Sequence, residues 1–197
     1  LGLELRFRLR SLQSDLRVPA NHIFILDSET DAQFIHYPVV GDASLGNFED
    51  VLLQLKTIIK PSDTLIVHFA CHGFTESVSL SNRRISPSDI SDALEPICSK
   101  VVLVNLDSCY AGSVAKVIGT KNYIAISPCG SDNKEYLAGE NTFSILFYKG
   151  FAAGVAADDN HDGKISVLEA YLWACAHSIV KYPEIRAELD PSKVFLK

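Results

Sequence analysis

The sequence has no methionine, one tryptophan and no apolar run long enough to cross a membrane. A transmembrane helix needs about 20 consecutive apolar residues, and nothing in the chain approaches that length. No segment has the basic, apolar and small-residue pattern of a secretory signal peptide. We therefore expect no membrane partner. Because the chain begins at Leu1 and lacks methionine, we expect it to be trimmed or processed, with segments missing.

Cysteine is present, but it lacks the arrangement of a disulfide-bonded scaffold. The five cysteines are an odd number, they are scattered along the chain, and no two of them form a Cys-x-x-Cys pair. Disulfides persist mainly in oxidising compartments, where small domains carry dense and even sets of cysteines. The pattern therefore predicts reduced thiols and a cytoplasmic protein.

An excess of basic charge is also absent. The chain has 18 Lys and Arg residues against 24 Asp and Glu residues, which gives a formal net charge of -6. Nucleic acids and anionic membranes attract basic proteins, so this balance does not favour either as a partner. The length of 197 residues, with 47% hydrophobic and 21% charged residues, is typical of one soluble globular domain.

Short apolar runs alternate with helical patterns along most of the chain. Continuous apolar strands between amphipathic helices are typical of a mostly parallel sheet that is covered on both faces. The sequence therefore predicts an α/β fold, a three-layer α/β/α sandwich. Residues 1–17 fit a helical stripe, although their first half also alternates as a strand does. The expected strands are 22–26, 64–70, 101–106 and 123–127, and the expected helices are 47–60, 86–99, 112–118, 143–156 and 167–180.

Two of these strands end in residues that can carry out nucleophilic chemistry. His72 follows the strand 64–70, and Cys109 follows the strand 101–106. In an open parallel sheet, ligands bind outside the carboxyl ends of the strands, so neighbouring strands would bring the two side chains together. The imidazole can then take the thiol proton and later protonate a leaving amine. The N–H groups of Gly73 and Cys109 can form an oxyanion hole.

Other interpretations of these residues are possible. Cys109 can be a buried thiol and His72 a loop histidine that never meet. Cys71 is a poor nucleophile candidate, because adjacent strand residues point to opposite faces of a sheet, and His68 reads as a core histidine. A zinc site using Cys71, His72 and Cys109 is a weaker idea, because adjacent residues on a strand are poor co-ligands.

The dyad residues and their surroundings resemble the caspase–hemoglobinase fold of cysteine peptidases. A strand ending in His72-Gly73 and a second ending in Asp-Ser-Cys-x-x-Gly-Ser (107–113) are similar to the metacaspases and prokaryotic caspase-like proteins, with legumain-like enzymes next. The resemblance runs from about residue 18 to residue 180. It includes a Pro-x-Asp helix entry at 86–90, a loop after a strand at 126–132 and a helix entry at 139–150.

This resemblance implies roles for individual residues. Cys109 would be the nucleophile and His72 the general base and acid, while Ser127 and Asp132 would line the primary specificity pocket. An acid in that pocket favours Arg or Lys before the scissile bond. The family fold also has a strand before its first helix. If residues 1–17 are helical, this single domain of residues 1–197 lacks that strand.

A separate stretch, residues 158–169, matches the twelve-residue calcium loop of an EF-hand. The matching residues are Asp158, Asn160, Asp162, Lys164 through its carbonyl, and Glu169 as the bidentate closing ligand, with Gly163 at the sharp turn. His161 is expected to be exposed rather than a ligand. The alternative is an acidic helix–loop–helix connection that binds nothing, because Ser166 and Glu169 also form a capping box.

The sequence thus predicts a cysteine endopeptidase that uses a His/Cys dyad, cleaves after a basic residue and is modulated by calcium. No cofactor is required for the chemistry, the partner is a protein or peptide substrate, and the sequence does not indicate an oligomeric state. The alternative is a catalytically inactive interaction module of the same fold that keeps the calcium loop.

Overall fold

The computed structural model describes residues 12–27, 39–119, 123–134 and 142–196. A four-stranded sheet forms its centre, in the order β3 (Thr64–Ala70), β7 (Val101–Asp107), β8 (Tyr123–Ser127) and β9 (Glu184–Ala187). The first three strands are parallel, and β9 runs antiparallel to β8. All seven residues of β7 are buried, as expected for the central strand of a sheet that is covered on both faces.

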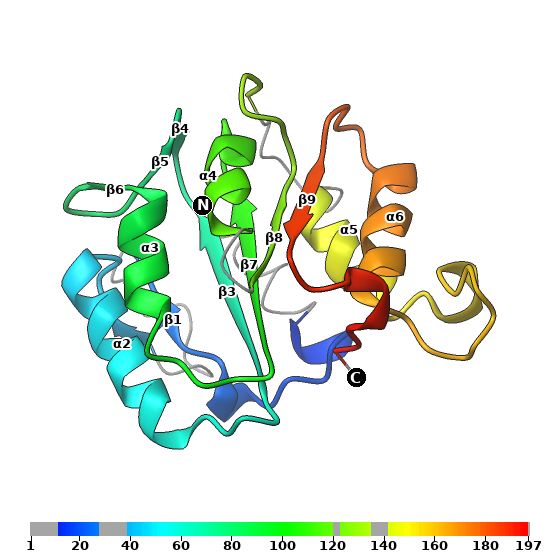
Figure 1. Ribbon diagram of the computed structural model, residues 1–197, viewed down its shortest axis with the longest axis horizontal. Coiled ribbons are helices and arrows are strands. Elements are labelled where there is room, and N and C mark those ends of the chain that lie inside the picture. The colour runs from blue at the N-terminus through cyan, green and yellow to red at the C-terminus, as the bar shows by residue number, and fades with distance from the viewer. Residues whose placement is uncertain (1–11, 28–38, 120–122, 135–141, 197) are drawn as a thin grey trace.

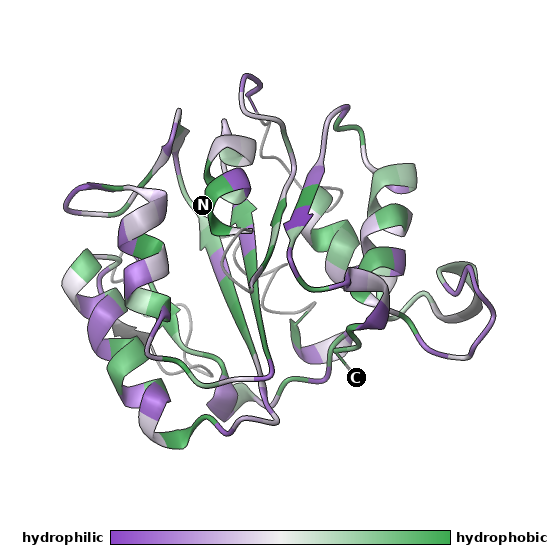
Figure 2. Cartoon of the chain, in the orientation of Figure 1, coloured by the Kyte–Doolittle hydropathy of each residue, from purple (hydrophilic) through white to green (hydrophobic). Residues whose placement is uncertain are grey.

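Helices cover both faces of this sheet, which confirms the predicted three-layer α/β/α architecture (Figure 1). One face packs against α2 (Leu45–Ile58), α3 (Pro87–Leu94) and α4 (Ala111–Ile118), and the other against α5 (Phe143–Gly150) and α6 (Val167–His177). Successive residues of β7 alternate between the two layers. Figure 2 shows that the central strands are largely hydrophobic, whereas α2 and α3 carry both hydrophobic and hydrophilic residues.

Two smaller sheets flank the central one. The strands β4 (Gly73–Phe74), β5 (Ser77–Ser79) and β6 (Arg84–Ile85) form an antiparallel sheet directly after β3. Near the N-terminus, β1 (Ile25–Leu26) pairs in parallel with β2 (Val39–Gly41). Three short 3-10 helices, η1 (Ala20–His22), η3 (Gly154–Ala156) and η4 (Pro191–Lys193), connect the larger elements.

Several predicted boundaries were wrong. Helix α2 begins at Leu45, two residues before the predicted start at Asn47. Ser44 caps it, because its hydroxyl accepts a hydrogen bond from the Asn47 N–H at 3.4 Å. The side-chain amide of Asn47 donates to Asp42. Helix α3 ends at Leu94, just before Glu95 and Pro96, rather than at residue 99 as predicted. Helix α5 ends at Gly150 rather than at residue 156. Strand β9 was not predicted, since its alternating residues give no continuous apolar run.

The N-terminal region is only partly described. Residues 12–14 are helical, whereas residues 1–11, which were predicted as a helix or a first strand, lie outside the described residues. None of the helices in the described ranges combines the length and apolar character needed to cross a membrane.

Candidate active site

The register of the central strands brings the segments that follow them, which carry His72 and Cys109, side by side. Strands β3 and β7 pair in parallel without a bulge, from Thr64 opposite Val101 to Ala70 opposite Asp107. His72 and Cys109 each lie two residues beyond the last pair of this ladder. Both residues therefore leave the sheet at its carboxyl edge, where open α/β sheets bind ligands.

Gly73 explains how closely the two segments approach. A Cβ atom at this position would collide with the carbonyl oxygen of Cys109, and it would lie 2.8 Å from the Ser108 hydroxyl and 2.9 Å from the Cys109 carbonyl carbon. Only a residue without a side chain fits there. The glycine after His72 thus packs the histidine segment directly against the backbone of the candidate nucleophile.

The chain turns sharply after Cys109. Tyr110 has a left-handed backbone with φ of 55° and ψ of 18°, a conformation that is uncommon for a residue with a side chain. Its N–H donates to the Asn133 carbonyl at 2.9 Å, and its carbonyl accepts a hydrogen bond from the Ser113 hydroxyl at 2.8 Å. The Ser113 hydroxyl in turn accepts from the Glu76 N–H at 2.8 Å. This turn is therefore fixed on both sides, by the loop after β8 and by the β4–β5 hairpin.

The loop after β8 forms a wall beside Cys109. A Cβ atom on Gly112 would lie 2.7 Å from backbone atoms of Gly130 and Ser131, so the loop lies flat against the start of α4. The Cys129 thiol also donates to the Ser108 carbonyl at 3.4 Å. The segment that was expected to line a substrate pocket thus contacts the Cys109 turn directly.

The two predicted pocket residues occupy different environments. Ser127 is fully buried, and its hydroxyl donates to the Cys129 carbonyl at 3.0 Å, so it supports the loop from beneath. Asp132 is exposed on the loop surface. Of the two, Asp132 is the side chain whose charge faces solvent.

The thiols around the site differ in their surroundings. Cys71 packs with the apolar cluster on the α2–α4 side of the sheet. Burial raises the pKa of the Cys71 thiol to about 12, and the Asp107 carboxylate adds to the rise, although a hydrogen bond with Ser79 opposes it. Cys71 is therefore protonated at neutral pH and is a poor nucleophile. Cys109 is only partly buried, so a substrate can reach it.

A buried polar cluster lies beneath the dyad on the α5 side of the sheet. His68 Nδ1 lies 2.9 Å from the Tyr148 hydroxyl, which also accepts a hydrogen bond from the Asn105 amide at 3.1 Å. His68 Nε2 is 3.7 Å from the Asp107 carboxylate, which accepts a hydrogen bond from the Ser144 hydroxyl. The sequence predicted a core histidine at position 68, and its largely buried side chain agrees with this, but its partners were not predicted. The signal for them was Asn105 and Asp107 within an otherwise apolar strand.

The predicted calcium loop lies on the far side of α5 and α6 from β7 (Figure 1). Side chains of the loop accept hydrogen bonds from its own backbone. The Asp158 carboxylate accepts the N–H groups of Asp162 at 3.1 Å and Gly163 at 2.9 Å, and Asn160 Oδ1 accepts the Asp162 N–H at 2.9 Å. Lys164 N–H donates to Asp162 at 2.9 Å. Gly163 has a φ of 80°, which suits a glycine at the turn.

The Glu169 carboxylate is also engaged within the loop. One oxygen accepts the N–H groups of Asp159 and Asn160 at 3.1 and 3.3 Å, and the other accepts the N–H and hydroxyl of Ser166 at 2.8 and 2.7 Å. Among the described residues, no group of three or more His, Cys, Asp or Glu side chains is arranged to hold a metal ion. The loop thus has the oxygen donors that calcium prefers, but its closing carboxylate is occupied by loop hydrogen bonds.

Comparison with known proteins identifies the fold. No protein-family model matches the sequence, and no curated protein matches it. Among solved structures, the chain is similar to caspase-1 from Spodoptera frugiperda, with a TM-score of 0.59 and 11% sequence identity over 96% of this chain and 80% of that one. At this identity the likeness establishes a caspase-like fold, and it does not distinguish metacaspases or legumains from other members.

Proposed function

We propose that this single caspase-like domain is a cysteine endopeptidase with Cys109 as nucleophile and His72 as general base and acid. The observation that supports it most is the close packing of Gly73 on the Cys109 backbone, beyond the parallel pairing of β3 with β7. The segments that carry the imidazole and the thiol are therefore neighbours, and the proposal requires the two side chains to come within hydrogen-bond reach of each other.

The proposed reaction has two stages. His72 takes the thiol proton as Cys109 sulfur bonds to the peptide carbonyl carbon, and the N–H groups of Gly73 and Cys109 stabilise the oxyanion. The C–N bond then breaks, and His72 gives its proton to the leaving amine. A water molecule, with its proton taken by His72, attacks the thioester and releases the acid, and the proton returns to the thiol.

We further propose that cleavage follows Arg or Lys. Asp132 precedes Asn133, whose carbonyl accepts a hydrogen bond from the Tyr110 N–H. The exposed Asp132 carboxylate therefore belongs to the loop segment that contacts the turn after Cys109. An exposed carboxylate attracts a basic substrate side chain and repels an acidic one. Buried Ser127 would contribute through the shape of this loop.

The test is labelling with a peptide that carries a thiol-reactive electrophile after Arg, with matched Lys, Asn and Asp peptides. We expect Arg and Lys peptides to label the protein, and Cys109→Ala to remove the label. A preference for Asn or Asp peptides would reject the basic specificity while leaving the dyad intact. Label that persists in Cys109→Ala would reject the dyad itself.

Calcium modulation is a separate proposal for the loop at 158–169. Asp158, Asn160, Asp162 and Glu169 would supply side-chain oxygens and Lys164 its carbonyl, and the ion would order the entry to α6. Glu169 would exchange its bonds to the Asp159 and Asn160 N–H groups for the ion. We expect calcium to raise the unfolding temperature, Asp162→Asn to weaken this effect, and Asp159→Asn, at a non-ligand position, to leave it unchanged. No calcium response in the parent chain would contradict the proposal.

The alternative is an inactive interaction module of the same fold. Such a module needs a surface for a partner, and a groove between α2 and α3 provides one whether or not the dyad is active. An absence of cleavage and labelling with every peptide, with and without calcium, would support it.

A further inference from the structure

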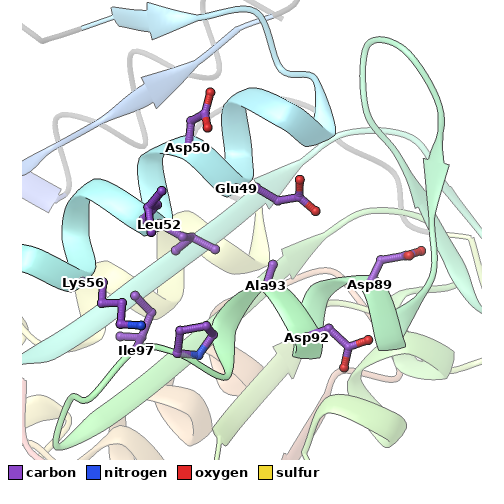
Figure 3. Close-up of a pocket in the computed structure, with 10 residues that line it drawn as sticks. Glu49, Asp50, Leu52, Lys56, Asp89, Asp92, Ala93 and Ile97 are labelled. Carbon is purple, nitrogen blue, oxygen red and sulfur yellow. The ribbon is translucent and has the colours of Figure 1, made fainter.

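A groove with a volume of about 450 Å³ separates α2 from α3 on the outer face of the sheet (Figure 3). Leu53 on α2, Ala93 on α3 and Pro96 just after α3 contribute apolar surface to it. The Leu53 side chain is 64% exposed, so this apolar surface is open to solvent. A volume in this range, roughly 300–1,000 Å³, is typical of sites that take up a ligand or a partner side chain.

The rim of this groove is acidic. Glu49 extends from α2 toward α3, and Asp89 and Asp92 line the α3 side, whereas Asp50 points away from α3 (Figure 3). Lys56 is the basic side chain of the lining and lies at the other end of the groove. Three carboxylates thus face one end of an apolar surface.

Helix capping accounts for only one of these acids. Asp89 accepts the Ser86 N–H at 2.6 Å in a capping box and lies 3.8 Å from the Arg83 guanidinium. Glu49 and Asp92 lie beyond the first turns of their helices, where the dipole has little effect. Neither forms a hydrogen bond or ion pair with any residue in the described part of the chain. Asp89 and Asp92 lie three residues apart on α3, a spacing that puts their side chains on the same side of the helix.

We propose that this groove is a docking site for a basic amphipathic helix of a partner protein. A Lys or Arg on the incoming helix would pair with Glu49 and Asp92, and a leucine-like side chain on the same face would cover Leu53. An apolar surface with acidic side chains at one end matches the helix-in-groove mode of recognition, in which anchors recur every three or four residues. Charge complementarity selects the basic partner over an acidic one.

The proposal is independent of the peptidase activity. The test therefore uses the Cys109→Ala variant of the whole 197-residue chain, which cannot consume the probe through the dyad. The probe is a fluorescent helical peptide with Leu and Lys at three- and four-residue spacing, and a second peptide replaces each Lys with Glu. Fluorescence anisotropy measures binding at several salt concentrations.

We compare the double variant Glu49→Lys/Asp92→Lys with a control, Asp159→Lys/Glu188→Lys, which changes the net charge equally at exposed positions elsewhere. We expect the basic peptide to bind, the groove variant to weaken binding about tenfold, and the control to bind within about twofold of the parent. Leu53→Ser, at an exposed position, should also weaken binding without lowering the unfolding temperature.

Three results would overturn the proposal. Equal weakening in both double variants would show attraction to net charge alone. Binding of the Glu peptide as tightly as the Lys peptide would remove the charge argument. Sedimentation of the parent as a dimer that Leu53→Ser dissociates would assign the groove to a contact between copies of this chain.

Discussion

Gly73 and Cys109 are in backbone contact, although 36 positions separate them in the sequence. The α-carbon of Gly73 faces the Cys109 carbonyl so closely that no side chain fits between them. This contact, more than the two strand ends themselves, sets the distance between the histidine and cysteine segments.

Gly73→Ala should therefore damage the site. The added methyl group must displace backbone atoms of Cys109, which costs about 1–3 kcal/mol of unfolding free energy and moves the nucleophile relative to His72. Urea unfolding and the rate of thiol labelling measure the two effects. Gly46→Ala is the control, because a Cβ there meets no atom within 4 Å and the change should stabilise helix α2 slightly. Normal stability and labelling in Gly73→Ala would contradict the packing.

The cysteines should differ in their reaction with a small alkylating agent. With a pKa of about 12, the Cys71 thiol stays protonated at every pH below that value, so alkylation between pH 6 and 9 should spare it. Peptide mapping by mass spectrometry gives the modified fraction at each cysteine. Exposed Cys98 provides the reference for an accessible thiol. Modification of Cys71 before Cys98 would mean that the apolar cluster does not protect it.

Removing the Ser144 hydroxyl should destabilise the polar cluster beneath the dyad. Ser144→Ala leaves the fully buried Asp107 carboxylate with one hydrogen-bond donor fewer, at a cost of about 1–3 kcal/mol. Tyr148→Phe should have a similar effect, because its hydroxyl serves His68 and Asn105. Urea unfolding at neutral pH measures both. Unchanged midpoints in both variants would show that the cluster contributes nothing to stability.

The loop at 158–169 should contribute stability that depends on pH. Burial acts to raise the Glu169 pKa, but hydrogen bonds from Ser166 and from the Asn160 and Asp159 N–H groups outweigh it, so the pKa lies below its ordinary value. A lowered pKa in the folded state stabilises the protein above the unfolded-state pKa, about 4.3. This stability is lost as the pH falls through the folded-state pKa.

The variant Glu169→Gln should therefore be less stable than the parent at pH 7, with a difference that shrinks below pH 4. Thermal unfolding between pH 3 and 7 in the presence of a chelator measures this difference. Asp159→Asn provides the control, since its side chain is exposed. A difference that stays constant over this range would exclude the ionised carboxylate as the cause.

The core of the fold was readable from sequence because local patterns specify it. The run from Val101 to Leu106 is so apolar that it predicts a central strand. Ser86-Pro87 predicts a helix start, because serine is a preferred N-cap residue and proline is favoured at the first helical position. Strand β9 was missed because Glu184 to Ala187 alternates at the edge of the sheet, where one face is less buried. Its position depends on pairing with β8, which no local pattern encodes.

The candidate site likewise combines residues that local patterns predict with contacts that only the folded chain creates. His72 and Cys109 were predicted as a dyad because each follows a buried strand and precedes a glycine. The packing constraint on Gly73 was not predicted, since it comes from Cys109, a contact between distant segments. The cluster of His68, Asp107 and Tyr148 was overlooked for the same reason. Residues that act through long-range contacts leave only a weak trace in a single sequence.

The most direct test of the dyad is the rate at which an Arg-containing peptide is hydrolysed by four proteins: the parent, Cys109→Ala, His72→Ala and Cys71→Ala. The proposed mechanism predicts no cleavage by Cys109→Ala, a loss of about a thousandfold in His72→Ala, and a rate close to the parent in Cys71→Ala. Cleavage that persists without Cys109, or that disappears only without Cys71, would contradict it.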